Sequence, residues 1–360
     1  MKKIAVNTGG GDAPGLNAVI RAVTLSALRE GWEVVGIPHG YAGLLDTSKL
    51  MPLTRERVRG ITSLGGTILG TANKGNPFEM PEEGPNGVTL VDRSDIVVDN
   101  FHKQGIDALV CIGGDGSMRI GKKFMLKGMP MVCVPKTIDN DVFGTAITFG
   151  FDTAVSTASD CIDKLQPTAE AHERVFVVEV MGRYVGWIAL NAGISTTADV
   201  ILLPEIPFDL DKVCAKIRER DAMGRKFSIV VVAEGAKPID ADTLFTQGPK
   251  EAGREIRLGG ISGWLAAEIA RRTGKETRSI ILGHLQRGGH PTTFDRLLCL
   301  RMGAAAVRFL KEGLTSVMTA LHPPSIVPFP VDESVGKMKC VPLDCDTIQT
   351  GRAIGVCFGD

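Results

Sequence analysis

Three acidic residues and one lysine lie in two short segments of the chain, IGGDGS (112–117) and PKTIDND (135–141). Asp115 and Asp141 have the chemistry that Mg²⁺ prefers, one or two carboxylates completed by water and phosphate oxygens. Asp139, on a loop, can accept a proton from an attacking hydroxyl, and Lys136 supplies positive charge. This set indicates phosphoryl transfer. The alternative for Asp139 and Asp141 is a solvated turn that caps a helix.

Two glycine turns, TGGGDAPG (8–15) and GGDGS (113–117), lead into helical patterns. Without Cβ atoms the backbone can approach an anion, and the first N–H groups of a helix point at it. The turns therefore predict a phosphate cradle. It is not a P-loop, because Leu-Asn follows Gly15 where Lys and Ser or Thr are needed. The first strand also lacks a G-x-G-x-x-G, which disfavours a nicotinamide-dependent oxidoreductase.

Short apolar runs alternate with helical patterns almost throughout the chain. Runs rich in Val and Ile without polar alternation belong to parallel sheets that are covered on both faces. The predicted strands are residues 2–8, 32–38, 106–114, 131–136, 175–182, 199–205, 227–235 and 279–284. They predict an α/β protein, doubly wound, with two Rossmann-like lobes, each a mostly parallel sheet flanked by helices, and an active site in the cleft.

We expect residues 1–150 plus about 286–335 to form a phosphoryl-donor lobe. Residues 151–285 plus about 336–360 would form a sugar-phosphate lobe. The segment 72–88 is rich in proline, glycine and polar residues and predicts an exposed loop or lid. A second polar break falls at residues 236–258.

Six of the predicted strands end in a polar or glycine signature. These endings are residues 8–15, 113–117, 136–141, 181–183, 234–235 and 285–289. Ligands bind beyond the carboxyl ends of strands in doubly wound sheets, so their joint occurrence indicates an active site. Ordinary strand-to-helix turns would explain any one of them alone.

Several cationic and polar residues near these strands suit a sugar phosphate. Guanidinium groups bind phosphate well, and the candidates are Arg174, Arg183, Arg278 and Arg287. Glu234 ends an apolar strand, so it needs a partner such as a sugar hydroxyl. His284 could bind a phosphate or a hydroxyl, although an isolated histidine in an apolar run is more often part of the core.

The charge is balanced, with 41 basic and 41 acidic residues, which gives no footprint for nucleic acid or a membrane surface. No run is long enough to span a bilayer. The eight cysteines are scattered without a C-x-x-C pair, and no signal peptide is recognisable. We expect reduced, buried thiols in a cytoplasmic protein.

From residue 3 to about residue 305 the chain resembles the phosphofructokinase family. The resemblance is carried by TGGGDAPGLNAVIR, GGTILG, IGGDGS, PKTIDND, EVMGR, AEG and ETRSIILGHLQRGG. It implies Mg²⁺-dependent phosphoryl transfer to the 1-hydroxyl of fructose 6-phosphate, giving fructose 1,6-bisphosphate. Asp139 would be the base, Asp115 and Asp141 would act through the metal, and Lys136 and Arg183 would neutralise developing charge.

The resemblance also implies binding roles. The sugar-phosphate residues would be Thr137, Arg174, Met181, Gly182, Arg183, Glu234, Arg278, His284 and Arg287. The nucleotide residues would be Gly10, Tyr41, Asn73, Lys74, Gly114, Asp115, Gly116 and Ser117. Arg174 and Arg278 match arginines that reach a neighbouring active site in the family, which implies a homo-oligomer, a dimer or a tetramer.

The family uses either ATP or pyrophosphate, and this chain mixes the two signatures. Pyrophosphate enzymes typically carry an aspartate in place of Gly116 and a lysine at Lys136. A carboxylate at position 116 would repel the α-phosphate of ATP, so we predict ATP, with a reversible pyrophosphate enzyme as the alternative. Leu25 replaces one effector-binding arginine, which predicts weak regulation or none. A catalytically silent sugar-phosphate sensor is the alternative of another class, disfavoured because all three carboxylates are kept.

Overall fold

The computed structural model describes residues 1–71, 75–84, 87–240, 244–246 and 258–360. The chain folds into two compact units. Unit 1 comprises Met1–Thr137, Val142–Gly150 and Gly288–Met338. Unit 2 comprises Ile138–Asp141, Phe151–Arg287 and Lys339–Asp360. The four residues Ile138–Asp141 thus belong to unit 2, although the chain on either side of them belongs to unit 1.

Unit 1 contains a seven-stranded sheet in the order β13-β12-β7-β6-β1-β2-β3. Its strands are β1 (Lys3–Thr8), β2 (Glu33–Ile37), β3 (Met51–Pro52), β6 (Ala108–Gly113), β7 (Met131–Pro135), β12 (Val317–His322) and β13 (Ser325–Pro330). The inner strands run parallel, while β3 and β13 pair antiparallel at the edges. The strand order reverses between β1 and β6, where doubly wound sheets bind their ligands.

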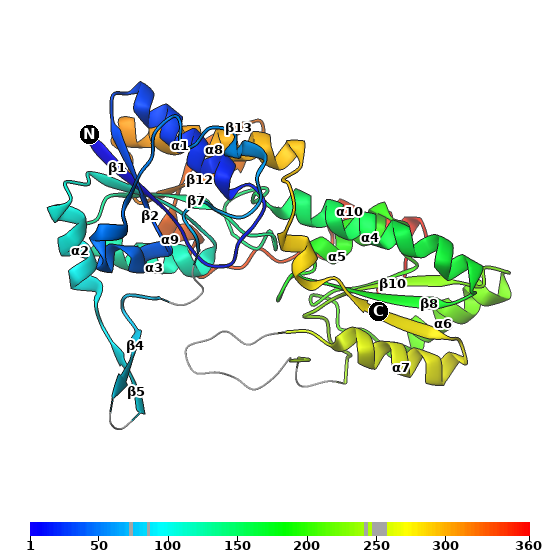
Figure 1. The fold of residues 1–360 in the computed structure, drawn as a ribbon. Helices are drawn as coiled ribbons and strands as arrows, with labels where there is room; N and C mark the ends of the chain where they lie inside the picture. Colours follow the sequence, from blue (N-terminus) through cyan, green and yellow to red (C-terminus); the bar gives the residue numbers. More distant parts are fainter. Residues whose placement is uncertain (72–74, 85–86, 241–243, 247–257) are drawn as a thin grey trace. The chain divides into compact units, whose positions relative to one another are not determined.

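Helices cover both faces of this sheet (Figure 1). On one face lie α1 (Leu16–Arg29) and α8 (Thr293–Lys311), and on the other lie α2 (Ser94–Lys103), α3 (Asp115–Leu126) and α9 (Val331–Ser334). Helices α1 and α8 approach closely because Gly303 has no side chain. A Cβ atom there would lie 2.7 Å from Ala22 Cβ and 2.8 Å from the carbonyl oxygen of Val19. Two apolar cores result, one on each face of the sheet.

Unit 2 contains a four-stranded, wholly parallel sheet in the order β11-β8-β10-β9. Its strands are β8 (Val175–Val180), β9 (Val200–Leu202), β10 (Ser228–Ala233) and β11 (Thr277–Ile281). Helices α4 (Phe151–Ala171) and α5 (Trp187–Ser195) cover one face, and α6 (Leu210–Ala222) and α7 (Ile261–Thr273) cover the other (Figure 1). Every residue of β8 and β10 is buried, including Glu179 and Ser228, as their mostly apolar sequences predict.

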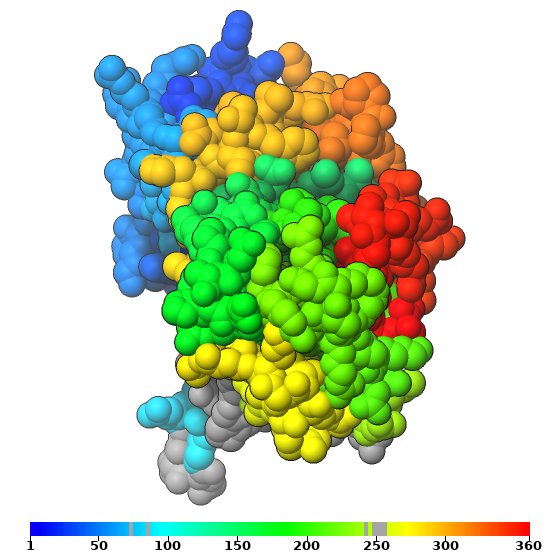
Figure 2. All heavy atoms as spheres, turned by 90° about the vertical axis from the view of Figure 1, so that its right-hand side faces the viewer, coloured from blue at the N-terminus to red at the C-terminus, as the bar shows by residue number. Residues whose placement is uncertain are grey.

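The last residues of the chain complete unit 2. Helix α10 (Asp346–Ala353) packs on α5, and Cys357 then pairs with Val200 at the open edge of β9. The N–H of Ile201 donates to the carbonyl oxygen of Cys357 at 2.9 Å. In Figure 2 this segment, in red, lies against green residues of the same unit. An edge strand that would otherwise expose its backbone is therefore covered.

All eight predicted strands are present, as β1, β2 and β6–β11. The prediction of a loop at residues 72–88 is wrong in part, because β4 (Met80–Gly84) and β5 (Gly87–Val91) form an antiparallel hairpin. Within the second predicted break, residues 241–243 and 247–257 lie outside the described chain. All eight cysteines are free, but Cys340 is exposed, against the prediction of buried thiols. No helix in the described ranges is long and apolar enough to cross a membrane.

Candidate active site

The two glycine turns of unit 1 lie side by side, because β1 and β6 are neighbouring strands. The N–H of Gly9 donates to the carbonyl oxygen of Ile112 at 2.9 Å. Both turns close on Ser117: a Cβ atom on Gly9 would lie 2.6 Å from Ser117 Oγ, and one on Gly113 would overlap the same side chain. A side chain at position 113 would overlap Ser117 Cβ, and one at position 9 would require the Ser117 hydroxyl to move. The predicted phosphate cradle, at the first turn of α3, therefore has the backbone that an anion site requires.

Lys136 lies beneath this cradle. It follows β7, and its N–H donates to the carbonyl oxygen of Gly113 at 2.9 Å. The side chain is 3% exposed, and its Nζ donates to the carbonyl oxygen of Gly11. A Cβ atom on Gly10 would lie 3.6 Å from Nζ. The buried ammonium thus places positive charge against the turn where a phosphate would bind.

Helix α3 begins with Asp115 and Gly116. Asp115 accepts a hydrogen bond from the N–H of Gly336 at 3.0 Å and pairs with Arg119 at 2.6 Å. Gly116, in contrast, faces open space, because a Cβ atom there would meet nothing within 4 Å. Gly114, just before this helix, lies close to the end of β7, because a Cβ atom there would be 3.2 Å from the carbonyl oxygen of Lys136. The fold itself would therefore accept a side chain at position 116.

Tyr41 is 3% exposed and lies inside unit 1. Its hydroxyl is 2.8 Å from Cys111 Sγ and 3.1 Å from the carbonyl oxygen of Ser117. Burial, with the nearby Cys111 and Cys133, raises the pKa of Tyr41 well above its usual value. Tyr41 therefore supports the backbone of the cradle at Ser117. Its direct contact with a nucleotide stays a prediction. Two further predicted nucleotide residues, Asn73 and Lys74, lie outside the described chain.

The segment Ile138–Asp141 carries the predicted base. Asp139 and Asn140 are 4% and 3% exposed, and Asn140 has a left-handed backbone, with φ 54°. Thr137, which the sequence predicts at the sugar phosphate, is also buried, and its carbonyl oxygen accepts from Thr148 Oγ1 at 2.8 Å. This part of the chain is fixed by backbone and side-chain hydrogen bonds, unlike a solvated turn.

At the carboxyl ends of β8 and β10 in unit 2, the predicted sugar-binding residues come together. Glu234 Oε1 accepts a hydrogen bond from the N–H of Arg183 at 3.0 Å. The backbone of Arg183 is left-handed, with φ 52°, and that of Gly182 has φ 144°. A Cβ atom on Gly182 would lie 2.5 Å from the carbonyl oxygen of Val185, and one on Gly235 would overlap that of Arg183. The glycines of MGR and AEG are thus required for the two strand ends to meet.

Glu234 has a pKa raised to about 7, mainly because burial disfavours its charged form. The negative charges of Asp139 and Glu179 raise the pKa further, while the N–H of Arg183 and the charge of Arg287 lower it. A carboxyl group in this state changes its charge near neutral pH. When it is ionised, both of its oxygens can accept a hydrogen bond from a sugar hydroxyl. When it is protonated, one oxygen carries the proton and acts as a donor.

Sequence reasoning missed Gln286, which is fully buried. Its Oε1 accepts from the N–H of Met181 at 3.3 Å, and its Nε2 donates to the carbonyl oxygen of Gly283 at 3.1 Å. It fixes the short helix η4 (Gly283–Arg287), which carries His284 and Arg287. His284 is exposed, so the alternative interpretation of a core histidine is wrong, and its binding of a phosphate stays a prediction. A glutamine between two predicted phosphate ligands was the available signal.

Arg174 and Arg278 lie at the other ends of the strands. Arg174 precedes β8 and Arg278 is the second residue of β11, so both are at the amino end of the sheet. Glu276 holds them together, at 2.9 Å from Arg174 and 2.5 Å from Arg278. This pair is therefore separated from Glu234 of the same chain by the length of the strands. The structure does not bring the two groups together within unit 2.

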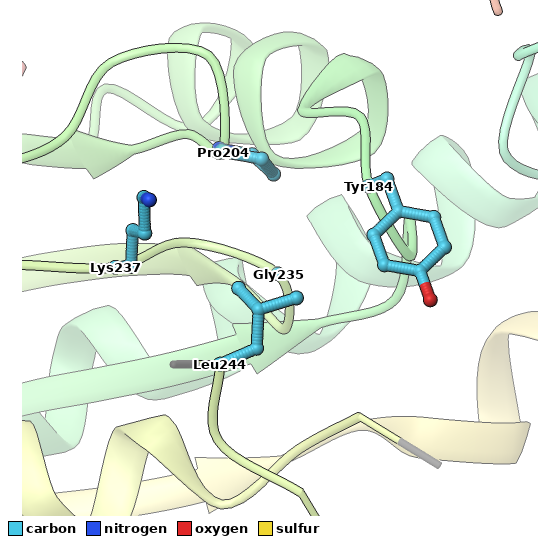
Figure 3. Close-up of a pocket in the computed structure, with 5 residues that line it drawn as sticks. All are labelled: Tyr184, Pro204, Gly235, Lys237 and Leu244. Atoms are coloured by element: carbon cyan, nitrogen blue, oxygen red, sulfur yellow. The ribbon is translucent and has the colours of Figure 1, made fainter. Parts of the chain in front are cut away.

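A cavity of about 230 Å³ opens beside the AEG turn, lined by Tyr184, Pro204, Gly235, Lys237 and Leu244. Figure 3 shows Pro204 and Leu244 on opposite sides of it, with Tyr184 and Lys237 at its ends. The guanidinium of Arg183 lies 5.6 Å from the ring centre of Tyr184. A second cavity of about 380 Å³ lies by the amino ends of β9 and β10, where Arg220 pairs with Asp199 at 2.8 Å.

For a metal, the described residues show no group of three or more His, Cys, Asp or Glu side chains. Mg²⁺ needs fewer protein ligands, because phosphate oxygens and water complete its coordination. Asp115 and Asp141 each offer carboxylate oxygens, which are hard donors of the kind that Mg²⁺ takes. The chemistry of each residue therefore fits Mg²⁺, and their sharing of one ion stays a prediction.

A glycine cradle, a buried lysine and carboxylates at strand ends define an α/β phosphotransferase. Residues 3–310 match the family model described as Phosphofructokinase, and the chain belongs to this family. It is 47% identical to the ATP-dependent 6-phosphofructokinase of Chloroflexus aggregans, over 100% of this chain and 98% of the relative. It is 45% identical to ATP-dependent 6-phosphofructokinase 2 of Clostridium perfringens, over 100% and 99%.

Other relatives broaden the comparison. The pyrophosphate–fructose 6-phosphate 1-phosphotransferase of Amycolatopsis mediterranei is 46% identical, over 95% of this chain and 97% of the relative. Among solved structures, Pichia pastoris phosphofructokinase in the T-state superposes with a TM-score of 0.79 at 32% identity. That match covers 98% of this chain but 36% of the yeast chain, so this chain spans about a third of its length.

Proposed function

We propose that the chain transfers the terminal phosphoryl group of ATP to the 1-hydroxyl of fructose 6-phosphate, giving fructose 1,6-bisphosphate. The observation that carries this proposal is the cradle of unit 1, in which Gly116 faces open space beside the glycine turns. A nucleotide has more phosphates to place than pyrophosphate has, and the open position leaves room for the α-phosphate. The ATP-dependent relatives, 42–47% identical to this chain, support the same donor.

Asp139 is the base in this proposal. Its buried position on a fixed loop suits a carboxylate that takes the proton as the 1-hydroxyl attacks. Phosphoryl transfer otherwise asks the protein for alignment and charge neutralisation, which Lys136 and Arg183 would supply. Asp115 and Asp141 would hold Mg²⁺, whose chemistry there is to neutralise charge on the phosphate oxygens.

Unit 1 would be the donor lobe and unit 2 the acceptor lobe. In unit 2, Glu234 and the N–H groups of the MGR turn suit sugar hydroxyls. His284 and Arg287 suit the 6-phosphate, because Gln286 fixes the helix that carries both. The charge of Arg287 also offsets the carboxyl groups around Glu234.

The position of Arg174 and Arg278 supports a homo-oligomer. If this pair binds a sugar phosphate, the acceptor residues it completes belong to another copy, because its own lie at the other end of the sheet. Strand β11 is an edge strand, and Ile281 at its end and Leu285 beyond it are 49% and 62% exposed. Such apolar side chains on an edge support a subunit contact. A dimer and a tetramer both satisfy this geometry.

A pyrophosphate-dependent enzyme is the second candidate, favoured by Lys136 in the cradle and by the relative from Amycolatopsis mediterranei. Assays of the purified protein with fructose 6-phosphate and Mg²⁺, one with ATP and one with pyrophosphate, decide between them. We expect turnover with ATP. Turnover with pyrophosphate alone would mean that Lys136 outweighs Gly116, and turnover with neither would favour a sensor. Asp139→Ser should abolish turnover while sugar-phosphate binding persists, and a parallel loss of binding would assign Asp139 a structural role.

A further inference from the structure

Lys339 lies in the segment after α9, outside every motif that the sequence offered. It makes two contacts with the loop 138–141 within unit 2. Its N–H donates to the carbonyl oxygen of Asp141 at 2.9 Å, and its Nζ donates to Asn140 Oδ1 at 2.7 Å. The backbone and the side chain of one residue thus bind two consecutive residues of the loop.

Lys339 is itself held from the side of α5. Its carbonyl oxygen accepts from Trp187 Nε1 at 2.8 Å, and its Nζ lies 5.6 Å from the centre of the Trp187 ring. Two residues on, the N–H of Val341 donates to Glu205 Oε1 at 2.9 Å, which also accepts from Gly186 at 3.1 Å. Trp187 binds the backbone of Lys339, and Glu205 binds the backbone of Val341. Because the chain is fixed at both residues, the ammonium of Lys339 has a defined position.

Asn140 is the residue that most needs such support. Its left-handed backbone, with φ 54°, is uncommon for a residue other than glycine, although asparagine adopts it more readily than most side chains do. Strained conformations of this kind persist where the surroundings over-determine them, often at active sites. Asn140 separates Asp139 from Asp141, so its backbone angles set the directions of the two carboxylates.

We propose that Lys339 is a positioning residue for phosphoryl transfer, which acts through Asn140 to hold the turn between Asp139 and Asp141. The proposal rests on the proposed function in treating that turn as catalytic. In this proposal Lys339 binds the turn and not the substrates. Its effect is on the geometry of the turn, where misplacement of a catalytic group by about 1 Å costs on the order of 100-fold in rate.

The test compares Lys339→Met, which keeps the apolar stem of the side chain and removes the donor, with Lys337→Met. Lys337 is exposed and lies over the ring of Phe143. We expect Lys339→Met to lower kcat by about 10- to 100-fold, with KM for both substrates changed less than about threefold. Lys337→Met should match the wild type. A wild-type kcat for Lys339→Met would overturn the proposal.

A double-mutant cycle tests whether the effect passes through Asn140. Asn140→Gly removes the acceptor and adopts the left-handed backbone without strain, so it should fold and lose kcat by a similar factor. Lys339→Met added to it should cost less than about twofold more. Additive losses would overturn the proposal, because Lys339 would then act elsewhere. A wild-type kcat for Asn140→Gly would also overturn it, even if Lys339→Met fails to fold.

Hydrogen exchange gives a readout that does not depend on activity. The amides of residues 139–141 should exchange faster in Lys339→Met than in the wild type, without substrates present. If the wild-type protein turns over neither ATP nor pyrophosphate, the proposed function fails, and exchange still tests the hold on the loop. If the wild type is active and both kcat and exchange are unchanged in the variant, only the role of Lys339 fails.

Discussion

At the scale of single residues, we propose that Gly116 decides which phosphoryl donor is used. The fold tolerates a side chain there, since a Cβ atom meets nothing within 4 Å, and an acidic residue suits the first turn of a helix. We expect Gly116→Asp to weaken ATP use by about 100-fold or more, because a carboxylate would face the nucleotide phosphates. Steady-state kinetics with ATP and with pyrophosphate measure the change, and thermal unfolding checks the fold.

Gly116→Asn is the matched control, because it has nearly the shape of aspartate without the charge. If asparagine weakens ATP use as much as aspartate does, the exclusion is steric. If both variants use ATP like the wild type, the role assigned to Gly116 is wrong.

Glu234 gives a pH dependence with a definite sign. Its pKa of about 7 means that the carboxyl group takes up a proton as the pH falls below neutrality. If the carboxylate accepts a hydrogen bond from the sugar hydroxyl, KM for fructose 6-phosphate rises as the pH falls. Well below the pKa, the rise approaches about tenfold per pH unit. The substrate phosphate also titrates near pH 6. Glu234→Gln provides the control. Its KM should be higher, and the pH dependence of its KM should be only the part that comes from the substrate phosphate.

The same shift affects stability. The folded protein binds this proton more tightly than the unfolded chain, where the pKa is near 4.5. The contribution therefore favours the folded state below pH 4.5 and is lost as the pH rises to about 7. Urea unfolding should show Glu234→Gln gaining stability over the wild type across that interval. A constant difference between the two proteins would contradict the raised pKa.

The residue patterns predicted the cradle and the MGR and AEG turns because their glycines and charges lie next to strand ends. They did not predict Gln286 or Lys339, whose partners are distant in sequence. Met181 is 105 residues from Gln286, and Asn140 is 199 residues from Lys339. No local pattern distinguishes such a glutamine or lysine from a solvated one.

At the scale of elements, α7 is tied to β8 through a buried carboxylate. Glu179 is 2% exposed, and it accepts hydrogen bonds from the N–H of Gly260, the N–H of Ser262 and Ser262 Oγ, at 2.8 to 3.1 Å. An anion at a helix N-terminus is favourable, and the N–H and hydroxyl of the buried Ser262 both depend on Glu179 as acceptor. The charge within an apolar strand is thus explained by the helix that it caps.

We expect Glu179→Ala to lower the free energy of unfolding by about 3 kcal/mol, since it leaves buried donors without an acceptor. Glu179→Gln should cost less, because one amide oxygen can still accept. Urea unfolding at neutral pH measures both. A loss below about 1 kcal/mol for the alanine variant would mean that α7 is held by its apolar face alone.

The elements themselves were largely predictable. Fully buried parallel strands leave continuous apolar runs, which the sequence shows without ambiguity. The hairpin β4–β5 escaped prediction because its sequence, MPEEG and GVTLV, is charged on one strand and is flanked by proline and glycine. Strands β12 and β13 escaped because they follow the last recognisable motif.

At the scale of the whole molecule, the arginine pair predicts shared active sites. Asp139→Ser and Arg278→Ala should each be nearly inactive at limiting fructose 6-phosphate. After the two proteins are unfolded, mixed in equal amounts and refolded, a hybrid dimer has one site with both native groups. Half of the dimers are then hybrids, so activity should return to about a quarter of the wild-type value.

Each variant refolded alone is the control for this experiment. Activity no greater than the mean of the two controls would mean that Arg278 does not complete a neighbouring site. Sedimentation of the wild type gives the size of the assembly.

The division of the chain into units also limits how this enzyme can be rearranged. Because Ile138–Asp141 and Lys339–Asp360 belong to unit 2, the chain passes between the units five times. A single recombination point cannot exchange one unit for that of a relative without splitting the other. New donor or acceptor preferences are therefore expected to arise by point substitution within one inherited chain, as the mixed signature of Gly116 and Lys136 illustrates, and not by exchange of whole lobes.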